Sequence, residues 1–143
     1  MLKGIPAILT PELLKILMEM GHGDEIVIGD GNFPAASIAP AGRLVRLDGN
    51  SGCEVLDAIL KLFPLDSYVE EPVTLMSVVP GDDVHPTIWN DYKAIIQRYE
   101  PDRKLGFIDR FGFYERARNA YAVVSTGETA IYANLILKKG VIK

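Results

Sequence analysis

The chain has 143 residues and a mass of 15.7 kDa, with 48% hydrophobic and 24% charged residues. Its net charge of −4 and its pI near 5.1 argue against nucleic acid as a partner, because binding to a phosphate backbone requires a basic surface. The single cysteine, Cys53, excludes an internal disulfide and a thiolate zinc site within one chain.

We expect one domain over residues 1–143, which can bury about 70% of the surface that its unfolded chain exposes. The N-terminus lacks a basic segment followed by a long apolar stretch, so we expect no secretory signal. No apolar run approaches the ~20 residues that cross a bilayer. The sequence therefore predicts a soluble cytoplasmic protein that does not enter a membrane.

The first predicted helix begins at Thr10-Pro11-Glu12, where Thr10 can cap the helix and Pro11 suits its first position. Gly21 and Gly23 are typical of the end of that helix. Residues 25–29 form an apolar run that predicts a buried strand, and a loop rich in glycine and proline follows. A second strand is predicted at residues 43–47.

Ser51-Gly52-Cys53-Glu54 has the spacing of a capping box and predicts a helix that Pro64 ends. Residues 72–79 are rich in aliphatic side chains and predict a central strand. The remaining predicted elements are, in chain order, a helix over 86–100, a strand over 104–109, a helix over 110–120, and strands over 121–125 and 132–137.

The alternation of strands and helices predicts an α/β fold with three layers, α/β/α, around a mainly parallel but mixed central sheet. Few residues separate the last two strands, which leaves no room for a helical crossover, so we expect that pair to be antiparallel.

His22 lies between Gly21 and Gly23, immediately before the strand predicted at 25–29. The glycines allow a ligand or another chain to approach closely, and an imidazole with a reference pKa near 6.5 suits proton transfer at neutral pH. The alternative, a solvent-exposed histidine at a helix end, is the commoner situation for a histidine in such a position.

Asp30 follows the same predicted strand, at the edge where open α/β sheets bind ligands. Its carboxylate suits hydrogen bonds from hydroxyl groups, and the alternative is a simple turn residue. We expect His22 and Asp30 to converge in one cleft.

Arg110 is predicted at a strand-to-helix junction, which again places it on the ligand side. Its five N–H donors are suited to holding polar oxygens. The alternative is an ion pair with Asp109, Glu115 or Glu128, which composition slightly favours.

The segment Tyr132-Ala133-Asn134 combines an aromatic face with an amide, a pairing typical of carbohydrate contact but not specific to it. Trp89, His85 and Tyr92 are candidates for a second aromatic wall. Tyr114 and its neighbouring phenylalanines are more typical of core packing.

Several motifs are absent from the sequence. There is no Gly-x-Gly-x-x-Gly, no Walker phosphate loop and no Gly-x-Ser-x-Gly, which disfavours nucleotide binding and a serine hydrolase. The two histidines lie far apart and have no acidic partner at metal-binding spacing. We therefore expect neither a metal nor a cofactor.

Motifs along the whole chain carry a resemblance to a known family. They are Met1-Leu2-Lys3-Gly4-Ile5-Pro6, Pro11-Glu12-Leu13-Leu14, Gly21-His22-Gly23-Asp24-Glu25, Asp30 with Phe33-Pro34-Ala35, Leu65-Asp66-Ser67-Tyr68, Asp109-Arg110-Phe111 with Phe113-Tyr114-Glu115-Arg116-Ala117, Thr126-Gly127-Glu128 and Tyr132-Ala133-Asn134. Together they resemble the L-fucose mutarotase and D-ribose pyranase family. The chain is nearer the fucose branch, since the ribose branch tends to carry a histidine where Arg110 stands.

The resemblance implies a cofactor-free isomerase of carbohydrate metabolism that interconverts the α and β anomers of L-fucose. Two alternatives stay open: pyranose–furanose interconversion of D-ribose, and a non-catalytic monosaccharide-binding protein linked to sugar uptake. The chain departs from the family's pattern at Gly31-Asn32 and at Ala36, and these departures bear on which sugar it prefers.

For the site, the resemblance implies that His22 transfers the proton, whether as acid, base or both. It implies that Asp30, Arg110, Tyr132, Ala133 and Asn134 bind the sugar. It also implies a ring-shaped homo-oligomer, a decamer, with active sites completed at subunit interfaces. The roles of His85, Trp89 and Tyr114 stay open.

Overall fold

A computed structural model describes residues 1–143, and its helices and strands alternate along the chain. The helices are α1 (Pro11–Glu19), α2 (Ala35–Ile38), α3 (Gly52–Leu60), α4 (Ile88–Tyr99) and α5 (Arg110–Arg118). The strands are β1 (Glu25–Gly29), β2 (Leu44–Leu47), β3 (Val73–Met76), β4 (Leu105–Ile108), β5 (Ala122–Thr126) and β6 (Leu135–Lys138). Every predicted element is present, and α2 is the element that the sequence did not predict.

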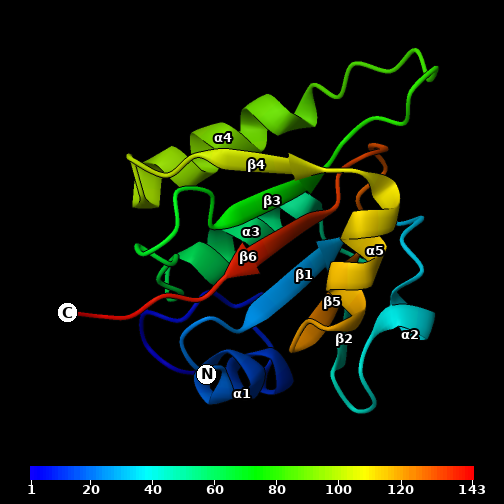
Figure 1. Cartoon of the computed structure of the whole chain (residues 1–143). Coiled ribbons are helices and arrows are strands. Elements are labelled where there is room, and N and C mark those ends of the chain that lie inside the picture. Colours follow the sequence, from blue (N-terminus) through cyan, green and yellow to red (C-terminus); the bar gives the residue numbers. More distant parts are fainter.

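The six strands form one mixed sheet in the order β2-β5-β1-β6-β3-β4 (Figure 1). The pairs β1–β5, β2–β5 and β3–β4 are parallel, and β6 is antiparallel to both of its neighbours, β1 and β3. The predicted α/β class with a mainly parallel sheet is confirmed. The prediction of a single domain over residues 1–143 stays a prediction.

One expectation about the sheet is wrong in part. β6 does run antiparallel to β5, but the two strands do not pair, because β1 lies between them. The segment 127–134 therefore passes over the carboxyl end of β1 before β6 begins. This path brings the residues just before β6 next to Asp30, which directly follows β1.

Helices cover both faces of the sheet, and alternate strand residues face the two layers, as the period of two along a strand requires. Ile26 and Ile28 of β1 belong to the larger apolar core beneath α1, α3 and α4. Val27 belongs to the smaller core beneath α2 and α5. Figure 1 shows α5 on the opposite side of the sheet from α3 and α4.

The predicted helix caps form as expected. The N–H of Leu13 donates to the Thr10 hydroxyl oxygen (3.2 Å) at the start of α1. In the capping box of α3, the Glu54 N–H donates to the Ser51 hydroxyl (3.2 Å), and the Ser51 N–H donates to the Glu54 carboxylate (2.8 Å). α3 ends at Leu60, a few residues before the proline that was expected to end it.

None of the helices combines the length and apolar character that crossing a lipid bilayer would demand.

Candidate functional site

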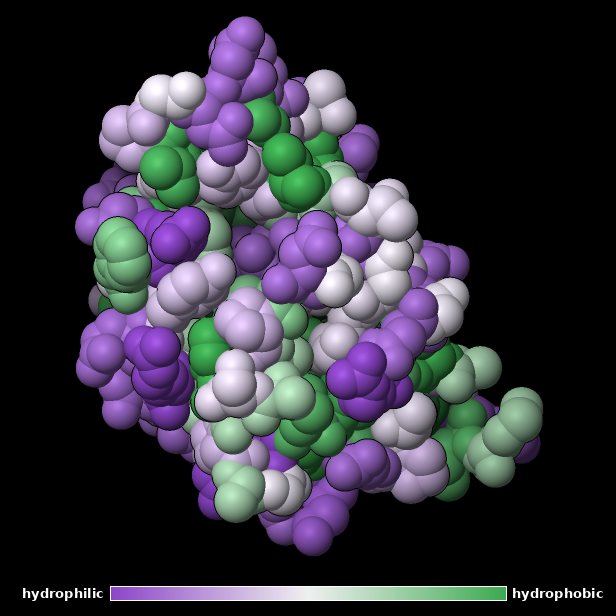
Figure 2. Space-filling model, turned by 90° about the vertical axis from the view of Figure 1, so that its right-hand side faces the viewer, coloured by the Kyte–Doolittle hydropathy of each residue, from purple (hydrophilic) through white to green (hydrophobic).

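A cavity of about 250 Å³ lies at the carboxyl ends of β1, β3 and β4, beside the start of β6. Figure 2 views the molecule from the side toward which these strands point, and hydrophilic and hydrophobic side chains are mixed on that surface. The residues that line the cavity are Asp30, Asn32, Phe33, Met76, Val79, Asp82, Arg110, Tyr114, Ile131, Tyr132 and Asn134. Four of the five predicted binding residues therefore meet here, and Ala133 contributes through its backbone.

Asp30 is the buried acceptor of the cavity, with 4% of its surface exposed. Its carboxylate accepts hydrogen bonds from the backbone N–H of Asn32 (2.9 Å) and of Ala133 (3.4 Å). Its own N–H donates to the side-chain oxygen of Asn134 (2.7 Å). Burial raises the pKa of Asp30, although the N–H donors of Asn32 and Ala133 act in the opposite direction. These bonds fix the carboxylate against the segment that precedes β6.

Tyr132 has an unusual backbone conformation, with φ of +58°, and it is the only non-glycine residue with positive φ. A left-handed conformation costs a residue with a Cβ about 1–2 kcal/mol. Its carbonyl accepts a hydrogen bond from the indole N–H of Trp89 (2.8 Å). Its hydroxyl donates to Asp82 (2.6 Å) and accepts from the N–H of Val79 (3.3 Å). The hydrogen bond to Asp82 raises the pKa of Tyr132, so the phenol stays neutral.

Arg110 is the first residue of α5 and has no carboxylate within 4 Å. The ion pair considered from the sequence does not form. Asp109 caps the helix by accepting from the Gly112 N–H (2.6 Å). The Arg110 guanidinium lies 5.2 Å from the centre of the Phe111 ring and 6.0 Å from that of Tyr114. Its N–H donors are therefore available to oxygens of a ligand.

The cavity suits a small ring that carries several hydroxyl groups. Asp30 and Asp82 accept hydrogen bonds, Arg110 donates them, and the Asn134 amide can do both. Apolar side chains cover the rest of its wall and can contact the C–H groups of a ring; they are Phe33, Met76, Val79 and Ile131. The volume corresponds to about eight water molecules at about 30 Å³ each, which fits one monosaccharide.

Sequence reasoning missed Asp82 and Met76 and left Tyr114 unassigned. Two signals could have indicated Tyr114 and Asp82. Tyr114 lies four residues after Arg110 in a predicted helix, which places both on one helix face. Val79-Pro80-Gly81-Asp82 contains a Pro-Gly pair, a strong turn signal directly after a predicted strand.

His22 lies elsewhere, in the turn between α1 and β1. Its Nε2 is 3.1 Å from a carboxylate oxygen of Asp66, and its side chain is 45% exposed. Burial acts to raise the pKa of Asp66, but hydrogen bonds from the Tyr68 N–H (3.0 Å) and from His22 outweigh it and lower that pKa. The Tyr68 ring lies beside the imidazole, with 5.4 Å between ring centres. An exposed imidazole held by a buried carboxylate is a suitable proton carrier.

The expected convergence of His22 and Asp30 does not occur within one chain. His22 precedes β1 and Asp30 follows it, so the five residues of β1 separate them. At about 3.3 Å per residue, the strand alone spans about 16 Å. An extended strand cannot fold back on itself, and accordingly His22 does not line the cavity at Asp30.

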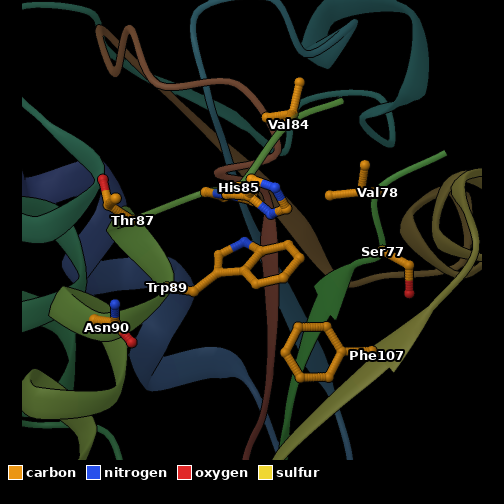
Figure 3. Close-up of a pocket in the computed structure, with 9 residues that line it drawn as sticks. Ser77, Val78, Val84, His85, Thr87, Trp89, Asn90 and Phe107 are labelled. Carbon is orange, nitrogen blue, oxygen red and sulfur yellow. The ribbon is translucent and has the colours of Figure 1, made fainter. Parts of the chain in front are cut away.

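A second, more open hollow of about 630 Å³ lies on the other side of the loop over residues 77–87. Figure 3 shows Trp89 between His85 and Phe107, and the Trp89 and Phe107 ring centres are 4.9 Å apart. Tyr92 is fully buried and donates its hydroxyl hydrogen to the carbonyl of Ala133 (2.9 Å). Trp89 and His85 therefore line this neighbouring hollow, and none of the three candidates for a second aromatic wall lines the smaller cavity.

Comparison with known proteins gives full-length matches. The model of the RbsD / FucU transport protein family matches residues 3–142. The human fucose mutarotase is 53% identical over 145 residues, covering 99% of this chain and 94% of that protein. The crystal structure of FucU from Bifidobacterium longum has a TM-score of 0.96 at 55% identity. That of the fucose mutarotase from Streptococcus pneumoniae in complex with L-fucose has a TM-score of 0.92 at 52% identity. Each covers 99% of this chain and 100% of the other.

Proposed function

The chain belongs to the RbsD/FucU transport protein family, and we propose that it is an L-fucose mutarotase, an isomerase that interconverts the α and β anomers of L-fucose. One observation carries this proposal. A cavity of monosaccharide size, with Asp30, Arg110 and Asn134 on its wall, lies in a chain that is 52% identical over its length to a fucose mutarotase crystallised with L-fucose.

The chemistry of the cavity agrees with this sugar. L-Fucose presents hydroxyl groups on adjacent ring carbons and a methyl group where most hexoses carry a hydroxymethyl group. The hydroxyls can bond to Asp30, Arg110 and Asn134, and the methyl group can contact apolar side chains such as Met76 and Ile131. Both kinds of surface are present in the one cavity.

Anomer exchange needs two proton transfers to open the ring and two to close it. A base removes the proton of the anomeric hydroxyl, the bond between C1 and the ring oxygen breaks as the C1 carbonyl forms, and an acid protonates the former ring oxygen. Rotation about the C1–C2 bond and reversal of these steps gives the other anomer. Since every bond broken is remade, we expect no metal or cofactor.

We assign the proton transfer to His22. Its Nε2 is held by Asp66 and the other ring nitrogen has no partner in the chain, which leaves that nitrogen available to a sugar oxygen. The carboxylate fixes the orientation of the imidazole. Asp30 and Arg110 hold the sugar hydroxyls so that the reacting atoms stay aligned.

Because His22 and Asp30 lie at opposite ends of β1, we propose that His22 of one copy completes the cavity of the next copy. Exposed apolar residues occur near both ends. Near the start of β1 they are Leu2, Met18, Leu62 and Ile142, which line a groove with Lys139, whose carbonyl accepts from the Gly23 N–H. At the other end they are Ile131, which lines the cavity, and Phe111, which lies against Arg110. These two surfaces differ, so their contact is head-to-tail, and a repeated head-to-tail contact that closes forms a ring. A ring-shaped decamer, as the family resemblance implies, would satisfy this geometry.

We place the protein in the cytoplasm, with a monosaccharide as its ligand and without nucleic acid as a partner, on the basis of its composition and acidic charge. These assignments stay predictions.

Saturation-transfer NMR on L-fucose, D-ribose and D-galactose tests the proposal in one series. We expect the wild-type protein to speed anomer exchange, with L-fucose fastest. His22→Ala should slow it by about 10²–10⁴-fold. His85→Ala is the matched control, because His85 is 94% exposed and does not line the smaller cavity.

The same series separates the alternatives. Binding of L-fucose with exchange at the buffer rate would favour the non-catalytic sugar-binding protein. Faster pyranose–furanose exchange of D-ribose than anomer exchange of L-fucose would favour the ribose activity.

A further inference from the structure

The loop over residues 77–87 connects β3 to α4. Its residues Val79 and Asp82 form part of the cavity wall. Within it, Val79-Pro80-Gly81-Asp82 forms a tight turn, closed by a hydrogen bond from the Asp82 N–H to the Val79 carbonyl (3.0 Å). Gly81 has φ of +91°, and proline followed by a glycine of positive φ is the signature of a type II turn. The local sequence therefore fixes the direction in which the turn presents Asp82.

This turn receives the hydroxyl group of Tyr132. The Val79 N–H donates to the phenol oxygen (3.3 Å), and the phenol donates to Oδ2 of Asp82 (2.6 Å). The single hydrogen of the hydroxyl is thus used by Asp82, and the Val79 N–H occupies one lone pair of its oxygen. The ring of Tyr132 can act as a wall of the cavity, but its hydroxyl has no hydrogen left to donate to a sugar.

The backbone of Tyr132 is held from the opposite side. The indole of Trp89 in α4 donates to its carbonyl, and the next carbonyl, of Ala133, accepts from the buried Tyr92 hydroxyl. The residue with the strained backbone is therefore fixed by the loop and by the helix that follows it. A strained residue that its surroundings fix so completely is typical of functional sites.

Asp82 retains one carboxylate oxygen, Oδ1, that makes no hydrogen bond within the chain, and Asp82 lines the cavity with Arg110. A carboxylate only accepts hydrogen bonds and a guanidinium only donates them. A ligand that meets both must offer a hydroxyl hydrogen to Asp82 and an oxygen to Arg110, and a hydroxylated ring offers both. The pair therefore favours a hydroxylated ligand over one that can only accept or only donate hydrogen bonds.

We propose that Asp82 is a specificity-determining residue of the sugar site: Oδ2 fixes Tyr132 as a wall, and Oδ1 accepts a hydrogen bond from one sugar hydroxyl. This inference rests on the proposed function, because it concerns the sugar that the cavity binds. Asp82 acts on binding and on the choice of sugar, whereas proton transfer belongs to His22.

Three variants test the assignment by anomer-exchange kinetics and by calorimetric titration with L-fucose. Asp82→Asn keeps the size of the side chain and an oxygen for Tyr132, so it should raise KM and the dissociation constant about tenfold while kcat changes little. Asp83→Asn is the matched control, since the Asp83 side chain in the same loop is fully exposed. Tyr132→Phe releases the loop but leaves the carboxylate, and it should weaken binding less than Asp82→Asn does.

A series of 2-, 3- and 4-deoxy-L-fucose provides a readout that a structural role would not change. The wild type should bind one analogue about tenfold more weakly than L-fucose, and Asp82→Asn should bind that analogue and L-fucose equally. An Asp82→Asn protein with unchanged KM, dissociation constant and analogue preference would overturn the assignment, whatever its thermal stability.

The two proposals fail in different ways. A wild type that binds L-fucose without speeding anomer exchange overturns the mutarotase proposal, and the dissociation constants of the variants still decide the role of Asp82. A wild type that exchanges anomers normally, with Asp82→Asn indistinguishable from it, overturns the role of Asp82 alone. A wild type that neither binds L-fucose nor speeds its exchange overturns both.

Discussion

Two inactive chains should restore activity when they assemble together. The first variant is His22→Ala, which lacks the proposed proton carrier but keeps the cavity residue Asp30. The second is Asp30→Ala, which keeps His22. Because β1, about 16 Å long, separates these residues in one chain, a working site must combine His22 of one copy with Asp30 of another.

The magnitude follows from counting the interfaces in a random mixture. A site is complete when the copy that supplies His22 is the Asp30→Ala chain and the copy that supplies the cavity is the His22→Ala chain. In an equal mixture each condition holds for half of the copies, so about one quarter of wild-type exchange should return in a head-to-tail ring. Each variant alone should remain near the buffer rate.

The assay is saturation-transfer NMR on L-fucose after co-expression of the two chains with different affinity tags and purification on both. A mixture of His22→Ala with the double variant His22→Ala/Asp30→Ala is the matched control, since no chain in it carries His22. Co-assembled His22→Ala and Asp30→Ala chains that stay as inactive as the control would refute a site shared between copies.

Three further predictions concern stability and reactivity. Tyr92→Phe should lower the free energy of unfolding, measured in urea, by about 1–3 kcal/mol, because it leaves the Ala133 carbonyl without its buried donor. Tyr99→Phe is the control and should lower it less, because the Tyr99 hydroxyl that it removes is exposed. The pKa of Cys53 is raised to about 11 by burial and then by the charges of Asp91, Glu128 and Glu54. Iodoacetamide at pH 8 should therefore alkylate the native protein about 100-fold more slowly than the urea-unfolded chain, because the thiolate is the reactive form. Equal rates would contradict this. The fold lowers the pKa of Asp66, so the stability that this group contributes is complete at neutral pH and is lost as the pH falls through the lowered pKa. Asp66→Asn should therefore reduce the loss of unfolding free energy on acidification, measured by urea unfolding at a series of pH values. An unchanged loss would contradict the ion pair with His22.

The sequence predicts most of the fold because its strongest signals are local. Thr10 caps α1, Ser51 and Glu54 form the capping box of α3, and an apolar run defines β1, all within a few residues. The position of β6 depends instead on which strand pairs with β1, which is a contact between distant segments. Local spacing indicated the direction of β6 but could not indicate that β1 lies between β5 and β6.

The same distinction applies to the cavity. Asp30 and Arg110 were found because each directly follows a predicted strand, Tyr132 because it stands beside an amide, and the family resemblance then gave all three a role in sugar binding. Asp82 was missed because its partner Tyr132 is 50 residues away, although the Pro-Gly turn that presents it is local. Asp66 was missed as the partner of His22 for the same reason, since 44 residues separate them.

The arrangement of β1 explains how a small chain can build a site that needs two separated groups. Ile26, Val27 and Ile28 are fully buried between the two helical layers, so this strand is a rigid connection. In a head-to-tail ring, His22 at one end of β1 serves one site and Asp30 at the other end serves the next. Each copy of β1 would then connect two successive active sites. In a ring of mixed wild-type and variant copies, a substituted β1 interior should disturb both sites to which that copy contributes, whereas a copy with His22 or Asp30 replaced should disturb one.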